Sequence, residues 1–126
     1  MSTPIEKLED NAAEEGNYPV EFSFYDEDDA VVTPNASTVS WELFDSSDTS
    51  LAEGDLDSAE EMVVLLVGDH LAISTTPDTY KTIGTVSIPL YLRRLTIQGV
   101  VDSDIGTNIP VNKEYIFYIE GMVGIV

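Results

Sequence analysis

Apolar and polar residues alternate along several short stretches of this chain, and a period of two is typical of half-buried β-strands. One such stretch begins at Tyr18 and a second begins near Ser37. The apolar faces of these two predicted strands carry, in order, Val20, Phe22 and Phe24, then Val39, Trp41 and Leu43. We place Trp41 at the centre of the predicted hydrophobic core.

The apolar run Met62–Val67 lacks this alternation. A continuous apolar run predicts either a strand that is covered on both faces or one whose second face meets a partner. Proline is confined to edges and bulges of sheets, so Pro89 marks an edge or a bulge. Further strands are expected over 86–101 and 115–120, and a short edge strand is expected at about 49–52 within the acidic loop 45–61.

Six or seven short strands separated by turn residues indicate an antiparallel β-sandwich. At 126 residues the chain has the size of one domain, and it shows no internal repeat. We therefore predict an all-β sandwich of six to eight strands over residues 18–126.

Residues 1–17 are predicted to form an acidic N-terminal arm or short helix. Thr3 and Glu6 have the spacing of a capping box, Pro4 suits the first helical position, and Gly16 can end the run. These signals predict a helix over about 4–14. Its apolar stripe is thin, so the segment is either a loose extension or an arm that becomes ordered on assembly.

Acidic residues are concentrated in the first half of the chain. Residues 1–61 hold 18 Asp and Glu residues and one base, whereas residues 62–126 hold six acids and four bases, out of a net charge of −19. Such acidity argues against nucleic acid and anionic lipid as partners, because phosphate groups would be repelled. The start of the chain lacks the pattern of a signal peptide, and its longest aliphatic run is too short to span a membrane.

No catalytic constellation stands out from the sequence. The chain has no cysteine and a single histidine, His70, which is best interpreted as a turn residue. Asp69, His70 and Ser74 can be combined into a triad on paper, but no nucleophile elbow or oxyanion motif surrounds them. We therefore predict no catalytic residues, no cofactor and no enzymatic activity.

Calcium is the strongest of the ligand hypotheses, because Asp and Glu on loops supply the hard oxygen donors that Ca²⁺ prefers. No stretch matches the calcium-binding loop of EF-hands, so we predict a hydrated acidic surface and no metal site. The acidic groups that carry the alternative are Asp26-Glu27-Asp28-Asp29, Asp45 with Asp48, Asp55 with Asp57, and Asp102 with Asp104. Arg93 and Arg94 should point to opposite faces of a strand, and at least one should reach an acidic cluster of this chain or another subunit. We favour an internal ion pair.

A family resemblance adds to this interpretation. It rests on an Asp-rich turn followed by Val-Thr-Pro, then Ser-Thr-Val-Ser-Trp-Glu-Leu-Phe-Asp, a Gly-Asp-His-Leu turn, Arg-Arg-Leu-Thr-Ile-Gln-Gly-Val-Val-Asp-Ser-Asp-Ile-Gly, and Pro-Val-Asn-Lys-Glu-Tyr-Ile-Phe-Tyr-Ile. Over about residues 18–120, this order of elements resembles the small immunoglobulin-like modules of virion proteins of tailed bacteriophages. The motifs are short, and similar turns occur in bacterial surface modules of the fibronectin type. Trp41 lacks the flanking cysteines of antibody domains, so a disulfide-bonded sandwich is not implied.

The resemblance implies a non-enzymatic virion structural protein, as a capsid decoration, neck (head-tail connector) or tail component. Such a protein would be present in multiple copies, assemble in the host cytoplasm and contact other virion proteins through its β edges and the apolar tail 121–126. The alternative is a calcium-dependent adhesion or carbohydrate-binding module. Ligand binding of that kind calls for exposed aromatic residues near the acidic loops, and the candidates are Tyr18, Tyr25 and Phe44.

Overall fold

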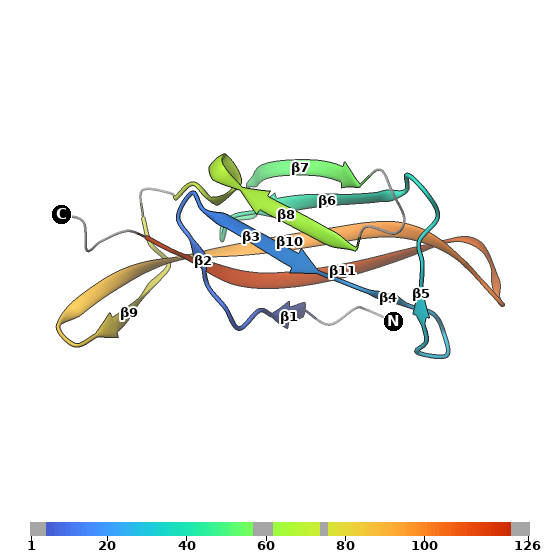
Figure 1. The fold of residues 1–126 in the computed structure, drawn as a ribbon, viewed down its shortest axis with the longest axis horizontal. Helices are drawn as coiled ribbons and strands as arrows, with labels where there is room; N and C mark the ends of the chain where they lie inside the picture. Colours follow the sequence, from blue (N-terminus) through green and yellow to red (C-terminus); the bar gives the residue numbers. More distant parts are fainter. Residues whose placement is uncertain (1–4, 57–61, 74–75, 122–126) are drawn as a thin grey trace.

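The computed structural model describes residues 5–56, 62–73 and 76–121, and these residues form two packed β layers (Figure 1). The large sheet has the strand order β1-β11-β10-β6-β7, with β2 also pairing with β11 and β9 with β10. Its strands are β1 (Ile5–Lys7), β2 (Ala12–Ala13), β6 (Val39–Phe44), β7 (Ser50–Leu56), β9 (Thr79–Ile83), β10 (Val86–Ser103) and β11 (Gly106–Glu120). The second layer pairs β3 (Asn17–Glu21) with β8 (Val63–Val67), and a small ribbon pairs β4 (Phe24–Tyr25) with β5 (Val31–Val32). The prediction of an all-β sandwich is confirmed at this level.

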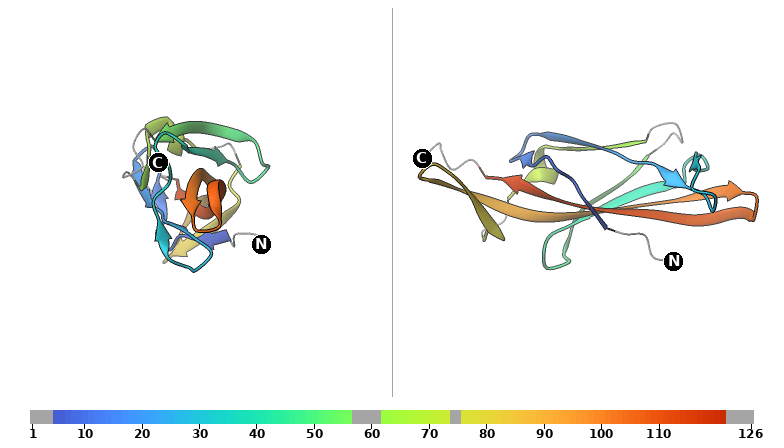
Figure 2. Two further views of the ribbon diagram at one scale, coloured as in Figure 1. Left: turned by 90° about the vertical axis from the view of Figure 1, so that its right-hand side faces the viewer. Right: turned by 90° about the horizontal axis from the view of Figure 1, so that it is seen from below.

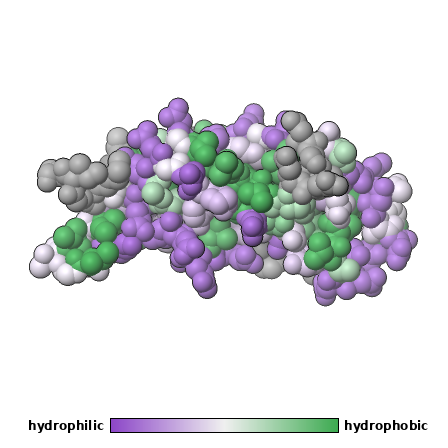
Figure 3. Space-filling view, viewed as in Figure 1, coloured by the Kyte–Doolittle hydropathy of each residue, from purple (hydrophilic) through white to green (hydrophobic). Residues whose placement is uncertain are grey.

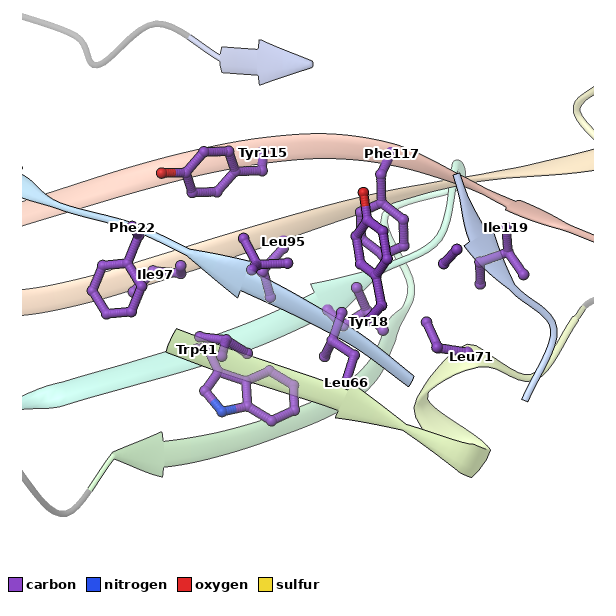
Figure 4. Packing of buried hydrophobic residues seen from close by; sticks show 14 of the residues in the cluster. Tyr18, Phe22, Trp41, Leu66, Leu71, Leu95, Ile97, Tyr115, Phe117 and Ile119 are labelled. Carbon is purple, nitrogen blue, oxygen red and sulfur yellow. The ribbon is translucent and has the colours of Figure 1, made fainter. Parts of the chain in front are cut away.

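The hydrophobic core lies between the β3–β8 layer and the large sheet (Figure 4). From the small layer, Tyr18 stacks on Phe117 of β11 with ring centroids 4.8 Å apart. Leu66 is fully buried, as is Leu95 on β10. The alternation predicted from Tyr18 onwards is confirmed, since Tyr18, Val20, Phe22 and Phe24 are all buried.

Trp41 belongs to this core but lies toward its margin. It retains 9% exposure, whereas Leu43 on the same strand retains none. Its indole packs against β7 at Gly54, where a Cβ atom would come within 2.8 Å of three ring atoms. On another side it meets the ring of His70 edge to face, with centroids 5.3 Å apart. Glycine at position 54 is therefore what allows β7 to lie over the tryptophan.

The prediction of a helix over about 4–14 is wrong for the described residues of that segment, because they are extended. β1 and β2 pair in parallel with β11, and the Leu8 amide donates to the Ile116 carbonyl at 2.9 Å. Ala12 is 1% exposed, so this part of the chain joins the core. A thin apolar stripe stabilises an isolated helix poorly, whereas pairing with β11 satisfies the backbone and buries Ala12 at once.

The last two strands are longer than predicted. β10 and β11 form one long hairpin, and β11 begins at Gly106 rather than near residue 115. β7 extends over Ser50–Leu56 instead of about 49–52, and β9 is a strand that the sequence pattern does not predict. As a result, the β9–β10 turn and the β10–β11 turn project at opposite ends of an elongated molecule (Figure 2). No helix within the described residues has the length and hydrophobicity of a membrane-spanning segment.

Candidate interaction site

The outer face of β8 is an uncovered apolar surface. Val64 and Leu66 point into the core and are fully buried, whereas Val63, Leu65 and Val67 point outward and are 37%, 54% and 42% exposed. The neighbouring strand adds Pro19, which lies opposite Leu65 and is also exposed. Figure 3 shows hydrophobic side chains gathered over this layer. Of the two predictions for Met62–Val67, coverage on both faces is therefore wrong for the described residues.

β8 also has an unpaired backbone edge, since among the described strands it pairs only with β3. The Phe22 amide donates to the Met62 carbonyl and the Gly68 amide donates to the Gly16 carbonyl, both at 3.0 Å. In an antiparallel pair the hydrogen-bonded positions alternate, so the even-numbered residues of this stretch face β3. The backbone groups of Val63 and Leu65 consequently point to the open edge.

His70 closes one end of that edge. Its Nδ1 atom accepts a hydrogen bond from the Val67 amide at 3.1 Å, within the short 3₁₀ turn Gly68–Leu71. His70 thus acts as a turn residue, as predicted. Because Nδ1 accepts a hydrogen bond from the Val67 amide, it does not donate one to Asp69 in the manner of a triad. Ser74, the third residue of that hypothetical triad, lies outside the described residues.

Three other edge strands, β1, β3 and β7, carry features that discourage pairing, and β8 does not. Charged residues and proline on an edge strand oppose the addition of a further strand. β7 carries Glu53 and Asp55, β1 carries Glu6 and Lys7, and β3 contains Pro19. β8 consists only of valine and leucine. Its edge is therefore the least protected against strand addition among these described strands.

A second apolar surface lies at the end of the β9–β10 hairpin, which we call the arm (residues 79–90). Tyr80 and Ile83 are each 59% exposed and Val86 is 47% exposed. Gly84 has a φ of +63° at the tip, a conformation that favours glycine. No acidic residue occurs between residues 79 and 101, although the chain as a whole has 24. The arm is thus an apolar, acid-free projection from an acidic body.

The acidic loops converge at the opposite end of the molecule. Carboxylate oxygens of Glu27, Asp28 and Asp104 lie within 4.8 Å of one another, and all three residues are exposed. The sequence suggested these groups separately, and the fold brings the β4–β5 turn to the β10–β11 turn. These three residues could hold a hard cation such as Ca²⁺.

Other acidic residues singled out from the sequence stabilise turns. Asp26 Oδ1 accepts from the amides of Asp28 and Ala30, and Asp45 Oδ1 accepts in the same way from Ser47 and Thr49. Asp102 Oδ1 accepts from the Asn108 amide at 2.9 Å and from Asn35 Nδ2 at 3.2 Å. These bonds favour the ionised form and lower the pKa of Asp102. Asp57 lies outside the described residues.

Asp55 lies beside a polar groove on the outer face of β7, β6 and β10. This groove, of about 380 Å³, is lined among others by Glu42, Glu53 and Asp55. Glu42 and Glu53 are direct cross-strand neighbours. Like charges in that position repel each other, so the groove suits a basic group of a partner.

The two adjacent arginines take different roles. Arg94 Nη2 lies 3.0 Å from Asp48 Oδ1 and its guanidinium lies over the Phe44 ring, which confirms the predicted internal ion pair. Arg93 is 1% exposed and donates to the carbonyls of Leu92 and Ala72 at 2.9 and 3.3 Å. Burial lowers the pKa of Arg93, while the nearby carboxylates act in the opposite direction.

The predicted aromatic candidates do not form one platform. Tyr18 is in the core, and Phe44 lies beneath Arg94. Tyr25 is 49% exposed, with the Lys113 ammonium 5.5 Å from its ring centroid.

Comparisons of the chain with protein-family models, with curated proteins and with solved structures each returned no match. Function is therefore inferred from the sequence and the geometry.

Proposed function

We propose that this protein is a non-enzymatic structural component of a tailed-bacteriophage virion, as a capsid decoration, neck or tail protein that acts through protein-protein contacts. The observation that carries the interaction role is β8, which combines an apolar outer face with an unprotected backbone edge. Large exposed apolar patches and open edges mark interaction surfaces. The virion as the site of this role rests on the resemblance of the sequence. Assembly would then take place in the host cytoplasm.

The strand order supports an immunoglobulin-like form of the sandwich. In such folds, strands G, F and C form one sheet, which C′ can extend, and strands B and E lie in the other. The order β11-β10-β6-β7 matches G-F-C-C′, and the pair β3-β8 matches B-E. The parallel pairing of β1 with β11 is what a first strand placed beside G would make.

The charge distribution supports other virion proteins as partners. A net charge of −19 disfavours contact with nucleic acid and membranes, and it steers the protein toward basic patches. Multiple copies in one particle would repel each other through their acidic surfaces and would make contact where acids are absent.

The test is incorporation of Leu65→Asp into particles, with Leu51→Asp as the matched control. Leu51 is 43% exposed on the β7 edge, so both changes place an acid at an exposed apolar strand position. We expect the Leu65 variant to be lost from purified particles and the Leu51 variant to be retained. Thermal unfolding of both variants checks that neither is lost through misfolding. Equal incorporation of the two variants would exclude β8 as the contact, and absence of the wild-type protein from particles would exclude the virion role.

The alternative is a calcium-dependent adhesion module, favoured by the convergence of Glu27, Asp28 and Asp104. Calcium that binds the folded state alone raises the melting temperature at constant ionic strength. In this alternative, Asp104→Asn abolishes that rise while Asp55→Asn, on the distant β7 edge, leaves it intact. An equal response to Ca²⁺ and to NaCl would indicate charge screening only.

A further inference from the structure

We infer that the occupant of the β8 edge is the arm of a second copy of this chain: β9 of one molecule adds as a strand to β8 of the next. This inference rests on the proposed assembly function and names the partner of the same surface. It is argued from three independent features of the two surfaces, which are their backbone groups, their side chains and their charge.

The backbone groups of the two edges match. β9 pairs only with β10 among the described strands, with Ile83 opposite Val86 and Tyr80 opposite Pro89. Pro89 has no amide hydrogen, so the Tyr80–Pro89 position suits a pair without hydrogen bonds, and the Thr82 position two residues later is of the same kind. The backbone groups of Tyr80 and Thr82 therefore point away from β10. They present the same two-residue spacing as Val63 and Leu65 on β8.

The side chains at the two edges are both apolar and exposed. In an antiparallel addition, Tyr80 of the arm would lie on the same face as Val63 and Leu65, whereas Ile83 would lie on the opposite face. Burial of this apolar surface stabilises the contact and offsets the cost of association. Each copy thus has one apolar projection and one apolar receiving surface.

Charge favours the arm over other parts of a second copy. Acidic residues flank β8 in the sequence, with Glu60 and Glu61 before it and Asp69 after it. Two antiparallel β8 strands would bring these acids toward each other, which is unfavourable. The arm has no acid of its own and carries Lys81, and the one acid beside it in the sequence is Asp78, so it brings fewer acids toward this region than a second β8 would. Lys81 Nζ also lies 2.8 Å from Glu120 Oε1 of its own chain, and this ion pair anchors Lys81 to the end of β11.

The position of the arm makes the contact intermolecular. The arm projects from one end of the long axis, whereas β8 lies over the middle of the large sheet (Figures 1 and 2). A copy cannot insert its own arm along its own β8 in this arrangement. A contact between two different surfaces is heterologous, so it builds a ring if the rotation closes and a filament if it does not.

The experiment measures self-association of the full chain by sedimentation equilibrium over a wide concentration range. Thr82→Pro removes an amide that points to the open edge of β9, and Thr82→Val is the control that keeps it. Leu65→Pro likewise removes an amide that points to the open edge of β8, and Leu65→Val is the control that keeps it. We expect each proline variant to weaken association at least about tenfold relative to its control. An equimolar mixture of the two proline variants should form heterodimers and nothing larger, since each retains one intact surface.

A second pair of variants guards against loss of folding. Tyr80 is 59% exposed, so Tyr80→Asp and Tyr80→Lys should both fold, as a thermal melt can verify. The two variants lose the same apolar contact but differ in charge, and the aspartate should weaken association more than the lysine. Association that is insensitive to every arm variant would overturn the inference in favour of a symmetric β8 contact, and a monomeric wild type at all concentrations would overturn it outright.

These results are separable from those that test the proposed function. A wild type that is monomeric in solution but enters particles through Leu65 leaves the assembly function in place and removes the arm as its partner. Self-association through the arm, together with absence from purified particles, removes the virion role and leaves the arm as the partner of β8.

Discussion

The edge at β7 and the edge at β8 are built in opposite ways. β7 carries two acids, lies beside the polar groove and is held on the body by the contact of Gly54 with Trp41. β8 has no charged residue and turns three branched aliphatic side chains outward. Acidic residues on an edge repel a further strand, whereas bare aliphatic edges accept one. The acidic residues therefore protect the β7 edge against strand addition and leave the β8 edge unprotected. This unprotected edge is informative about function.

The largest expected effect on this comparison comes from Trp41→Ala, which removes the support of the β7 edge. The loss of buried surface and the cavity left behind should lower the free energy of unfolding by about 3–5 kcal/mol. Urea denaturation followed by far-ultraviolet circular dichroism measures this change. Near-normal stability would contradict the packing of the indole between Gly54 and His70.

Deletion of residues 1–16 tests a third edge, that of β11. A loose extension or an arm that becomes ordered on assembly, as the sequence predicts, would leave the sandwich folded when it is deleted. The structure changes the expectation, because β1 and β2 pair with β11 and Ala12 is buried. Lost hydrogen bonds and apolar contacts should lower the free energy of unfolding by about 2–3 kcal/mol. The newly exposed β11 edge should also promote aggregation, which light scattering detects.

A deletion of residues 1–4 alone is the control, since these residues precede β1. An unchanged melting temperature for the deletion of 1–16 would contradict the role of β1 and β2 in the sheet.

Alkaline pH tests the same edge more gently, through Tyr115. Burial raises the pKa of Tyr115 to about 12, and Glu6 on β1 and Tyr25 add to this shift. The unfolded state loses this phenolic proton at lower pH than the folded state, so its contribution to stability is full below about pH 10 and is lost as pH rises toward 12. We expect Tyr115→Phe to reduce the fall in melting temperature over that range. A Tyr80→Phe variant, whose side chain is exposed, serves as the control.

The alternation of side chains is sufficient to predict the strands around Val20 and Trp41, because a buried face leaves a period of two in the sequence. It is insufficient for Met62–Val67, where the exposed face is as apolar as the buried one, and only the structure distinguishes them. The prediction of an N-terminal helix fails for a related reason. Capping residues describe a local preference, and the pairing partner of this segment, β11, is more than 100 residues away.

The candidate site is predictable in part. The sequence identifies the apolar run and the acidic groups, but the convergence of Glu27 and Asp28 with Asp104 depends on long-range topology. The alternation of apolar and polar residues does not distinguish the arm from the rest of β10. The one available signal is the absence of acids between residues 79 and 101 in such an acidic chain.

The smallest expected effect concerns the stability that is lost because β7 carries acidic residues. Glu42 and Glu53 lie directly opposite each other on the outer face, and like charges in a cross-strand pair are destabilising. Glu53→Gln should therefore raise the free energy of unfolding by about 0.2–1 kcal/mol at low salt. Because salt screens exposed charges, the gain should shrink in concentrated NaCl. Glu21→Gln, opposite the uncharged Val63, is the matched control and should show no such gain. If Glu53→Gln is both stabilising and more prone to associate, the acids on β7 lower the stability of the protein but keep that edge unpaired. The absence of acids on β8 is then the complementary feature that leaves the other edge open.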